Sequence, residues 1–371
     1  MSNAATTTTA SLYLADGLIF KGKSFGAKGT VGGEICFNTG MTGYQEVFTD
    51  PSYAGQVLVM NSAYIGNYGI KESDTESNGT KISGLIAKNI SNKYSRMVAT
   101  DSLENYLIKN NIIAIYDIDT RSLVQHIRNS GAMNCIISTE LSTPVELSNA
   151  LNSIPDMAGL ELASLVSTKN TYYFGDPAAK FRVAVMDYGV KKNILKSLAD
   201  RNMYLAVFPS NTTMKVIEAF QPDGYFLSNG PGDPASMQDA VEMVRLMLNT
   251  NKPIFGICLG HQLLARANDI DTYKMHHGHR GLNHPVMNLA TGKAEITTQN
   301  HGFSINPETI KQDSNIEITH LNLNDGSIEG IKLKNKPAFS VQYHPESSPG
   351  PQDSRYLFDN FYDLMHISKA G

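Results

Sequence analysis

The chain has 371 residues, of which 41% are hydrophobic and 18% are charged, and this composition argues against a disordered protein. Its 31 basic and 35 acidic residues give a net charge of −4, so we expect neither a nucleic-acid partner nor an anionic membrane surface. No apolar run approaches the roughly 20 residues that a membrane span requires. The three cysteines are too few for a disulfide framework and fit a cytoplasmic protein.

The first part of the chain is typical of a small mixed α/β domain. Residues 1–10 lack a basic region followed by an apolar core, so we expect a disordered tail rather than a signal peptide. After this tail, apolar runs punctuated by glycine predict short strands, and a domain is expected over residues 11–152. The strands are predicted at Ser11–Leu14, Leu18–Phe20, Glu34–Asn38 and Gln56–Met60, and the helices at Asp101–Asn110, at Thr120–Ser130 (N-cap Thr120, stop at Gly131) and from Thr143-Pro144 onward.

A connector over residues 153–180 precedes a different pattern, in which strands and helices alternate up to residue 371. The strands are predicted at Arg182–Met186, Tyr204–Phe208, Gly224–Leu227 and Pro253–Ile257, and the helices near Asn193–Arg201, Met214–Ala219, Ala235–Leu248 and Gly260–Ala267. This alternation predicts an α/β domain over residues 181–371, with a mostly parallel sheet covered by helices on both faces. Ligands bind beyond the carboxyl ends of such strands, so the loops after Leu227 and Ile257 are the candidate sites.

A cysteine flanked by glycines stands where one of these strands runs directly into a helix. Gly256 and Gly260, two residues before and after Cys258, permit the sharp strand-to-helix turn of a nucleophile elbow. The turn would expose the sulfur at a helix N-terminus, where the partial positive charge favours the thiolate. The N–H of Leu259 would then point at an oxyanion formed beside the sulfur. The alternative is a buried structural cysteine, but the glycines and the strand–helix context favour a nucleophile.

A thiolate nucleophile requires a base, and the base requires an orienting group. His344 follows an apolar strand, Pro345 fixes the turn, and Glu346 is placed to fold back toward the imidazole. A lone histidine at a strand end is more often a satisfied loop residue, but the carboxylate two residues later favours a base–orienter pair. The sequence alone does not show that His344 meets Cys258.

The segment Ser228–Pro234 is a third candidate, because it follows an apolar strand and holds two glycines and two prolines in seven residues. This composition makes a stiff turn with exposed backbone. The segment is either a surface β-turn without a chemical role or a part of the site. In the second case the N–H of Gly232 would be a second oxyanion donor.

Two further sets of residues are interpreted as structural. Cys36 and Cys135 alternate with apolar neighbours in predicted strands. Four histidines between Met275 and Pro285 suggest a metal site, but neither a cysteine nor a carboxylate lies among them. Glycines and a proline mark this segment as a loop, so we expect no bound metal.

The Gly-x-Cys-x-Gly elbow and the later His-Pro-Glu together resemble the class I (triad) glutamine amidotransferases, from Phe181 to the C-terminus. Motifs in the N-terminal half extend the resemblance, along essentially the whole chain, to the small subunits of glutamine-dependent carbamoyl-phosphate synthetase. These motifs are Phe37–Glu46, Thr49–Tyr53, Ile65–Gly69 and Ala114–Arg121. Gly40 is a small departure, since alanine or serine is expected there.

The resemblance implies hydrolysis of L-glutamine to glutamate and ammonia, with Cys258 as nucleophile, His344 as general acid/base and Glu346 as its orienter. It implies that glutamine is bound by Ser52, Gly230, Gly232, Leu259, Gln262, Asn300, Gly302 and Phe303. It also implies an ammonia tunnel to a large subunit, which binds ATP and Mg²⁺ and makes carbamoyl phosphate from bicarbonate for arginine and pyrimidine biosynthesis. No cofactor is expected in this chain, which has no Walker-type phosphate loop, and the histidine-rich segment resembles a family loop that binds no metal.

Two other functions stay open. A γ-glutamyl peptidase could use the same Cys–His–Glu set, without a partner or a dedicated N-terminal domain. A non-catalytic regulatory or scaffold subunit could keep the fold with a dead site, although the intact Cys258, His344 and Glu346 argue against it. Slow glutamine hydrolysis by the isolated chain that rises on adding a synthetase subunit would separate an amidotransferase subunit from a peptidase.

Overall fold

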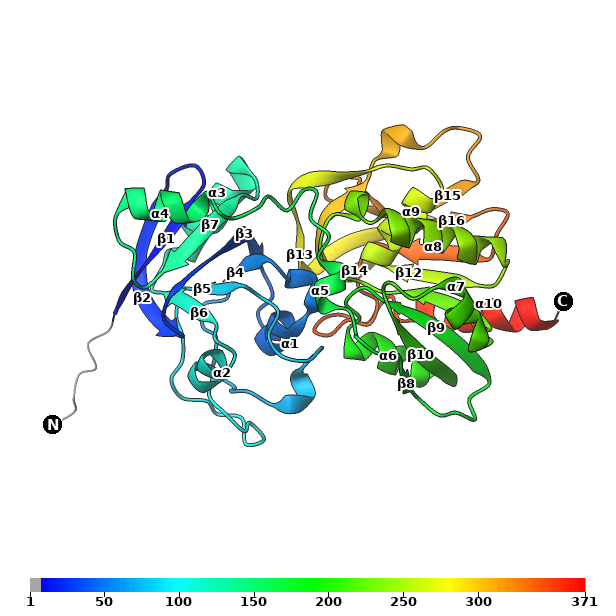
Figure 1. The fold of residues 1–371 in the computed structure, drawn as a ribbon, viewed down its shortest axis with the longest axis horizontal. Coiled ribbons are helices and arrows are strands. Elements are labelled where there is room, and N and C mark those ends of the chain that lie inside the picture. Colours follow the sequence, from blue (N-terminus) through cyan, green and yellow to red (C-terminus); the bar gives the residue numbers. More distant parts are fainter. Residues whose placement is uncertain (1–7, 371) are drawn as a thin grey trace. The chain divides into compact units, whose positions relative to one another are not determined.

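The computed structural model describes residues 8–370. Residues 1–7, most of the expected N-terminal tail, lie outside the described residues, and the first strand already begins at Thr9. The chain forms two compact units, one ending at Met157 and the other beginning at Ala158 (Figure 1). Among the described residues, none of the helices combines the length and the apolar character that a membrane crossing requires.

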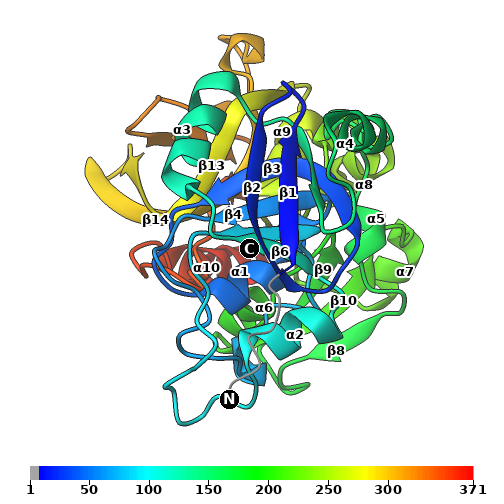
Figure 2. The same ribbon diagram turned by 90° about the vertical axis from the view of Figure 1, so that its left-hand side faces the viewer.

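The described part of the first unit is a closed barrel with the strand order β1-β2-β6-β5-β4-β3-β7. Its strands are β1 (Thr9–Leu14), β2 (Ile19–Gly26), β3 (Thr30–Asn38), β4 (Gln56–Met60), β5 (Gly84–Ala87), β6 (Ile113–Tyr116) and β7 (Asn134–Ser138). Strands β3, β4, β5 and β6 pair in parallel and the other neighbours pair antiparallel, as for β1 and β2 in Figure 2. Closure leaves no sheet edge for another chain to pair with.

Helices and apolar clusters occupy both faces of the barrel sheet. The helices are α1 (Tyr44–Thr49), η1 (Pro51–Tyr53), η2 (Glu72–Asp74), α2 (Leu103–Lys109), α3 (Thr120–Ser130) and α4 (Pro144–Leu151). Along β3, Ile35 and Phe37 join one cluster while Cys36 joins the other, the period-2 alternation of a strand buried on both faces. Cys135 lies in the same cluster as Ile35 and, like Cys36, is buried.

Helix α3 ends at the predicted glycine but begins with a different cap. The side chain of Asp119 accepts a hydrogen bond from the N–H of Ser122, so Asp119 is the N-cap and the expected Thr120 is the first helical residue. Both residue types are good caps, and the pattern alone does not choose between neighbours. Gly131 has a φ of 93°, which explains why the helix stops there.

The described part of the second unit is built on a ten-stranded sheet with the order β14-β13-β15-β16-β17-β12-β11-β9-β10-β8. Its strands are β8 (Tyr172–Phe174), β9 (Phe181–Asp187), β10 (Met203–Pro209), β11 (Gly224–Leu227), β12 (Ile254–Ile257), β13 (Thr272–Asn288), β14 (Lys293–Ile305), β15 (Ile316–Asn322), β16 (Ile328–Leu333) and β17 (Ala338–Val341). Strands β17, β12, β11, β9 and β10 pair in parallel and form what we call the parallel half. Strands β13 to β16 pair antiparallel and form the antiparallel half.

Helices cover both faces of this sheet, which confirms the predicted arrangement. Apolar side chains of α7, α8 and α9 pack on one face, and those of α6 and α10 pack on the other. The helices are α5 (Ala163–Val166), α6 (Lys192–Ala199), α7 (Met214–Ala219), η3 (Pro234–Ser236), α8 (Gln238–Asn249), α9 (Leu259–Ala267), η4 (Pro307–Thr309) and α10 (Tyr356–Ala370). The expected connector, residues 153–180, holds α5 and β8.

The prediction of a loop between Met275 and Pro285 is wrong, because this segment lies within the long strand β13. The pairing of β13 with β14 shifts register twice, after Lys274 and after Gly281. The glycines that made this segment resemble a loop lie at these irregularities of the strand. Glycine within a strand often marks such an irregularity. The histidines of this segment are therefore held in a sheet.

Candidate active site

Cys258 occupies a strained turn between β12 and α9. Its backbone has φ 55° and ψ −105°, a region that residues with a side chain rarely adopt, at a cost of about 1–3 kcal/mol. Two glycines make the turn possible: a Cβ on Gly256 would lie 2.7 Å from the carbonyl oxygen of Gly260, and one on Gly260 would lie 2.2 Å from that of Leu227. The elbow therefore requires glycine at both positions.

The backbone around Cys258 is anchored on both sides, which fixes the direction of the helix. Its N–H donates to the carbonyl oxygen of Val341 at 2.9 Å, and its own carbonyl accepts from the N–H groups of His261 and Gln262 at 3.0 and 3.2 Å. The N–H of Leu259 donates no hydrogen bond to any described residue. It is thus available as the oxyanion donor that the sequence predicts.

The turn after β11 presents the second predicted donor. Gly232 has a φ of 97°, and a Cβ there would lie 2.7 Å from the carbonyl oxygen of Leu160, so glycine is required. The next N–H, of Asp233, donates to that same oxygen at 2.8 Å, whereas the N–H of Gly232 makes no hydrogen bond within residues 8–370. Gly230 is required as well, because a Cβ there would lie 2.2 Å from the carbonyl oxygen of Tyr188.

His344 and Glu346 form a buried pair just beyond the end of β17. The Nδ1 atom of His344 lies 2.8 Å from Oε1 of Glu346, and both side chains are at most 1% exposed. This contact directs Nε2 of His344 away from the carboxylate, and Nε2 has no hydrogen-bond partner among the described residues. The pair is oriented as the His-Pro-Glu motif predicts.

Lys191, which the sequence analysis did not single out, completes this pair. Its Nζ donates to the same Oε1 of Glu346 at 2.8 Å and to the carbonyl oxygen of Ser348 at 3.0 Å, and its side chain is 3% exposed. Lys191 follows β9, two strands along the parallel half from Cys258. A buried lysine is stable as a cation only beside such a carboxylate.

The electrostatics of the pair favour a charged imidazole. Burial opposes the charged form of His344, but the carboxylate of Glu346 and the nearby sulfur of Cys258 outweigh it and raise the pKa of His344 to about 10. Burial likewise opposes ionisation of Glu346, but Lys191 and then His344 lower its pKa to about 2. At neutral pH the site holds an imidazolium and a carboxylate. The sulfur of Cys258 thus contributes to the raised pKa of His344, although it forms no hydrogen bond with Nε2 of His344.

One side of the site is formed by β14 of the antiparallel half and by Gln342, which follows β17. The Cys258 sulfur contacts the backbone oxygen of Asn300 at 3.6 Å and Nε2 of Gln342 at 3.7 Å. Nε2 of Gln262 donates to the backbone oxygen of Phe303 at 2.8 Å and to Oε1 of Gln342 at 3.0 Å. Gln342 is a second contact residue that the sequence analysis missed.

Two other predicted glutamine contacts, Gly302 and Ser52, make none of the contacts described so far. Gly302 lies between Asn300 and Phe303 on β14 and is partly exposed. Ser52 belongs to the first unit, where its N–H donates to the side chain of Asp50 at 2.9 Å at the start of η1. The role of Ser52 in binding glutamine stays a prediction.

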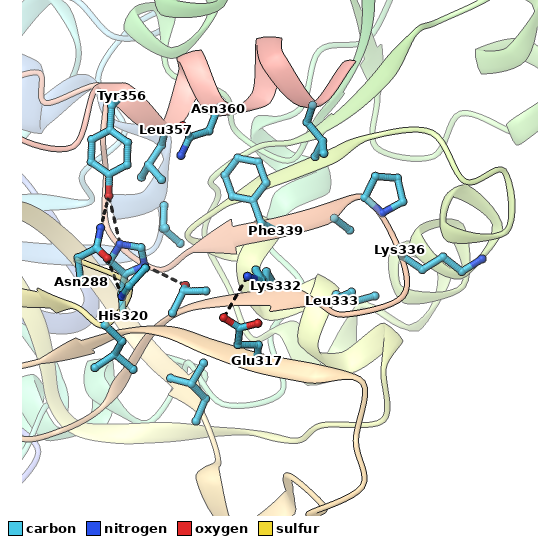
Figure 3. Close-up of a pocket in the computed structure, with 18 residues that line it drawn as sticks. Asn288, Glu317, His320, Lys332, Leu333, Lys336, Phe339, Tyr356, Leu357 and Asn360 are labelled. Carbon is cyan, nitrogen blue, oxygen red and sulfur yellow. Dashed lines mark hydrogen bonds and ion pairs between the residues drawn. The ribbon is translucent and has the colours of Figure 1, made fainter. Parts of the chain in front are cut away.

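The structure also contains a cavity that none of the predicted residues lines. It has a volume of about 510 Å³ and lies between α10 and strands β15, β16 and β17 (Figure 3). The hydroxyl of Tyr356 accepts from Asn288 at 2.8 Å and lies 3.3 Å from Nε2 of His320 at one end, and Phe339 lines the wall.

Comparison with known proteins covers both units. Residues 184–364 match the family model of glutamine amidotransferase class-I, and residues 12–137 match that of the carbamoyl-phosphate synthase small chain, CPSase domain. Carbamoyl phosphate synthase small chains from Synechococcus sp., Aquifex aeolicus and Thermosynechococcus vestitus are 47%, 47% and 48% identical to this chain. These matches cover 95%, 96% and 96% of this chain and 93%, 98% and 97% of the relatives. The chain therefore belongs to the carbamoyl phosphate synthase small chain family.

Proposed function

We propose that the chain hydrolyses L-glutamine at Cys258 and passes ammonia to a separate large subunit that makes carbamoyl phosphate. The observation that carries this proposal is the juxtaposition of the Cys258 elbow with the buried His344–Glu346 pair, just beyond the ends of the neighbouring strands β12 and β17. A nucleophile, a proton carrier and its orienter are the parts that acyl transfer requires.

In the first half of the reaction, the Cys258 thiolate attacks the side-chain carbonyl carbon of glutamine. The N–H groups of Leu259 and Gly232 stabilise the resulting oxyanion, and losing one such donor typically slows a reaction about 100–1,000-fold. His344, protonated because its pKa is raised, gives its proton to the leaving nitrogen. The carbon–nitrogen bond breaks, ammonia leaves, and a γ-glutamyl thioester remains.

In the second half, neutral His344 removes a proton from water, and the hydroxide attacks the thioester. The carbon–sulfur bond breaks, the new γ-carboxyl group loses its proton to solvent, and glutamate leaves. His344 and Cys258 are then back in their starting imidazolium and thiolate forms. Glu346 stabilises the imidazolium in each cycle, and Lys191 keeps Glu346 ionised throughout. No cofactor in this chain is needed for these steps, and we propose that ATP and Mg²⁺ bind to the large subunit.

The product supports a partner that consumes it directly. Ammonium has no lone pair with which to attack, and water at neutral pH would protonate most of the released ammonia. A sealed route to the partner would keep the product reactive. We propose that this assembly works in the cytoplasm, where the sparse cysteines stay reduced.

A chloroketone analogue of glutamine tests the nucleophile and the substrate class together. We expect the full chain to take up one label on Cys258, excess glutamine to prevent labelling, and Cys258→Ser to abolish it. Peptide mass spectrometry locates the label. Stoichiometric label on another residue, or glutamine hydrolysis that survives full labelling of Cys258, would overturn the proposal. Hydrolysis that does not accelerate on adding the large subunit would favour a γ-glutamyl peptidase instead.

A further inference from the structure

The antiparallel half contains a buried polar cluster that the proposed reaction does not use. His279 on β13, His301 on β14 and Glu329 on β16 bring ligating atoms within 4.8 Å of one another, and all three side chains are buried. The imidazole rings of His279 and His301 meet edge to face, with their centroids 5.0 Å apart. Because buried polar groups are costly unless they are paired, this cluster needs a physical explanation.

His279 lies between two carboxylates. Its Nε2 is 2.9 Å from Oδ2 of Asp325, and its Nδ1 is 3.5 Å from Oε1 of Glu329. Glu329 is fully buried, and the amide of Asn322 donates to its Oε1 at 2.8 Å. The other oxygen of Glu329, Oε2, has no hydrogen-bond partner among the described residues. Glu329 is therefore a buried carboxyl group of which only one oxygen is paired by a hydrogen bond.

His301 connects this cluster to the glutamine pocket. Its Nδ1 donates to the backbone oxygen of Phe303 at 2.8 Å, and the same oxygen accepts from Nε2 of Gln262 at 2.8 Å. His301 itself stands between Asn300 and Gly302, two of the predicted glutamine contacts. A shift of the His301 ring would thus move the backbone oxygen that holds Gln262.

Either a metal ion or a proton on His279 could face the carboxylate of Asp325, and the neighbouring charges favour a proton. Nε2 of His279 lies 2.9 Å from Oδ2 of Asp325, and the buried Arg280 acts on His301 in the same cluster. Asp325 balances one proton on His279, whereas a divalent cation would place additional positive charge near Arg280.

The ring of His284 also contacts that of His279, with centroids 5.3 Å apart, and the pKa shifts of His279, His284 and His301 agree with a single proton on His279. Burial opposes the charged form of His279, but Glu329 and Asp325 outweigh it, so the pKa of His279 is raised. Burial lowers the pKa of His301 well below its usual range, and burial lowers the pKa of His284 to about 4. Of these three histidines, only His279 has its pKa shifted toward the charged form.

We propose that His279, held as an imidazolium between Asp325 and Glu329, is a positioning residue for glutamine binding. Its ring packs edge to face against that of His301, which Gln299 also contacts at Nε2 at 2.9 Å. His301 in turn holds the backbone oxygen of Phe303 that binds Gln262. The inference rests on the proposed function, because it assigns a role to residues around the same pocket. It predicts that loss of the His279 charge weakens glutamine binding and leaves the chemical steps nearly unchanged.

The pH dependence follows from the raised pKa of His279. The folded-state pKa lies above the ordinary value of 6.5, so the folded protein favours the charged form, and the charge is lost as the pH rises through the raised pKa. The titratable groups that face His279 are Asp325, Glu329, His284 and His301, and Arg280 acts on His301. We therefore expect the KM for glutamine to rise on the alkaline side while kcat changes little.

Glu329→Gln tests this proposal, with Glu317→Gln as the matched control. Both substitutions neutralise a carboxylate in the antiparallel half, but Glu317 lies on the neighbouring β15 and is 45% exposed beside Lys332. In the full chain assembled with the large subunit, we expect Glu329→Gln to raise the KM for glutamine about 5–30-fold, with kcat within about twofold, the effect of losing one charge-assisted contact. We also expect the alkaline rise in KM to move to lower pH. Glu317→Gln should match the wild type in both measurements.

Three results would overturn the proposal. One is an unchanged KM at every pH for both Glu329→Gln and a second variant, Asp325→Asn, which covers the possibility that the first fails to fold. Another is a fall in kcat at constant KM. The third is one tightly bound metal ion per wild-type chain, measured by elemental mass spectrometry, that Glu329→Gln loses. A wild-type chain that does not hydrolyse glutamine would instead refute the proposed function, so the two failures are distinguishable.

Discussion

The two halves of the ten-stranded sheet carry their polar residues in different places. In the parallel half, the reactive and charged groups stand in loops just after strands: Lys191 after β9, Gly232 after β11, Cys258 after β12 and His344 after β17. In the antiparallel half, polar groups such as His279 and Glu329 lie within buried strands and bind one another.

This difference suggests a division of labour between the halves. Loops at the carboxyl ends of parallel strands all open at one edge of the sheet, so groups far apart in the sequence can meet a single substrate atom. Side chains inside antiparallel strands cannot reach that edge, but they can fix the wall beside it. We expect substitutions in the parallel half to lower kcat and those in the antiparallel half to change KM or stability.

The largest effect is expected for Cys258→Ser. Without the thiolate no thioester forms, so glutamine hydrolysis should fall by about 10⁴–10⁶-fold, the range seen when a nucleophile is removed. Synthesis of carbamoyl phosphate from added ammonia by the assembled enzyme should persist, because it bypasses this site. Glutamate release and ammonia-dependent synthesis are the two assays. His344→Asn should behave similarly, and wild-type hydrolysis by either variant would contradict the assignment.

A smaller loss of kcat is expected for Lys191→Met. Removing the cation takes away one charged hydrogen bond from Glu346, which corresponds to about 10–100-fold in rate. The pKa of Glu346, now about 2, should rise. Because a lowered carboxyl pKa protects the ion pair until the pH falls through it, the acid limb of the kcat profile should move to higher pH. Lys196→Met, at an exposed position on α6, is the control. Equal pH profiles for the two variants would exclude this role.

Tyr356→Phe should separate stability from activity in the antiparallel half. Its hydroxyl donates to Oε1 of Glu295 at 2.8 Å and accepts from Asn288, at the end of the cavity in Figure 3. Losing it should lower the free energy of unfolding by about 1–3 kcal/mol without changing kcat. Urea denaturation of Tyr356→Phe and of Tyr362→Phe, on the same helix, measures the difference. A matching loss in both variants, or a fall in kcat for Tyr356→Phe, would break the proposed division between the halves.

The smallest effect concerns backbone strain at the elbow. Both Cys258→Gly and Cys258→Ala remove the sulfur, but only glycine adopts φ 55° and ψ −105° without strain. Relief of the strain stabilises the glycine variant, whereas the greater entropy of its unfolded chain opposes this effect. We expect the glycine variant to be more stable than the alanine variant by about 1 kcal/mol. Thermal unfolding of the two inactive variants decides this. Greater stability of the alanine variant would mean that the turn is not strained.

Much of the parallel half could be predicted from the sequence, because its signals are local. Gly256, Cys258 and Gly260 lie within five residues, and the steric contacts that require these glycines are short-range. His344, Pro345 and Glu346 are consecutive or nearly so, and the predicted orientation of the imidazole matches the 2.8 Å contact. The strands and helices around them follow from apolar periodicity and caps.

The remaining features depend on contacts between distant segments. Lys191 and Glu346 meet only through the sheet order, and a lysine after a strand resembles any surface lysine in the sequence. A search of every loop at the carboxyl edge, including the one after β9, could have found Lys191. The segment from Met275 to Pro285 was mistaken for a loop because its glycines form bulges in a strand, and the carboxylate that faces its histidines comes from β16.

The backbone conformation of Cys258 has an evolutionary consequence. Selection for folding alone would favour glycine at this position, since glycine removes the strain and nothing in the packing requires a thiol. A cysteine kept here is therefore maintained by its chemistry. A duplicated copy of this chain that no longer needed to hydrolyse glutamine would be expected to replace Cys258 early, while Gly256 and Gly260 persisted because the fold still depends on them.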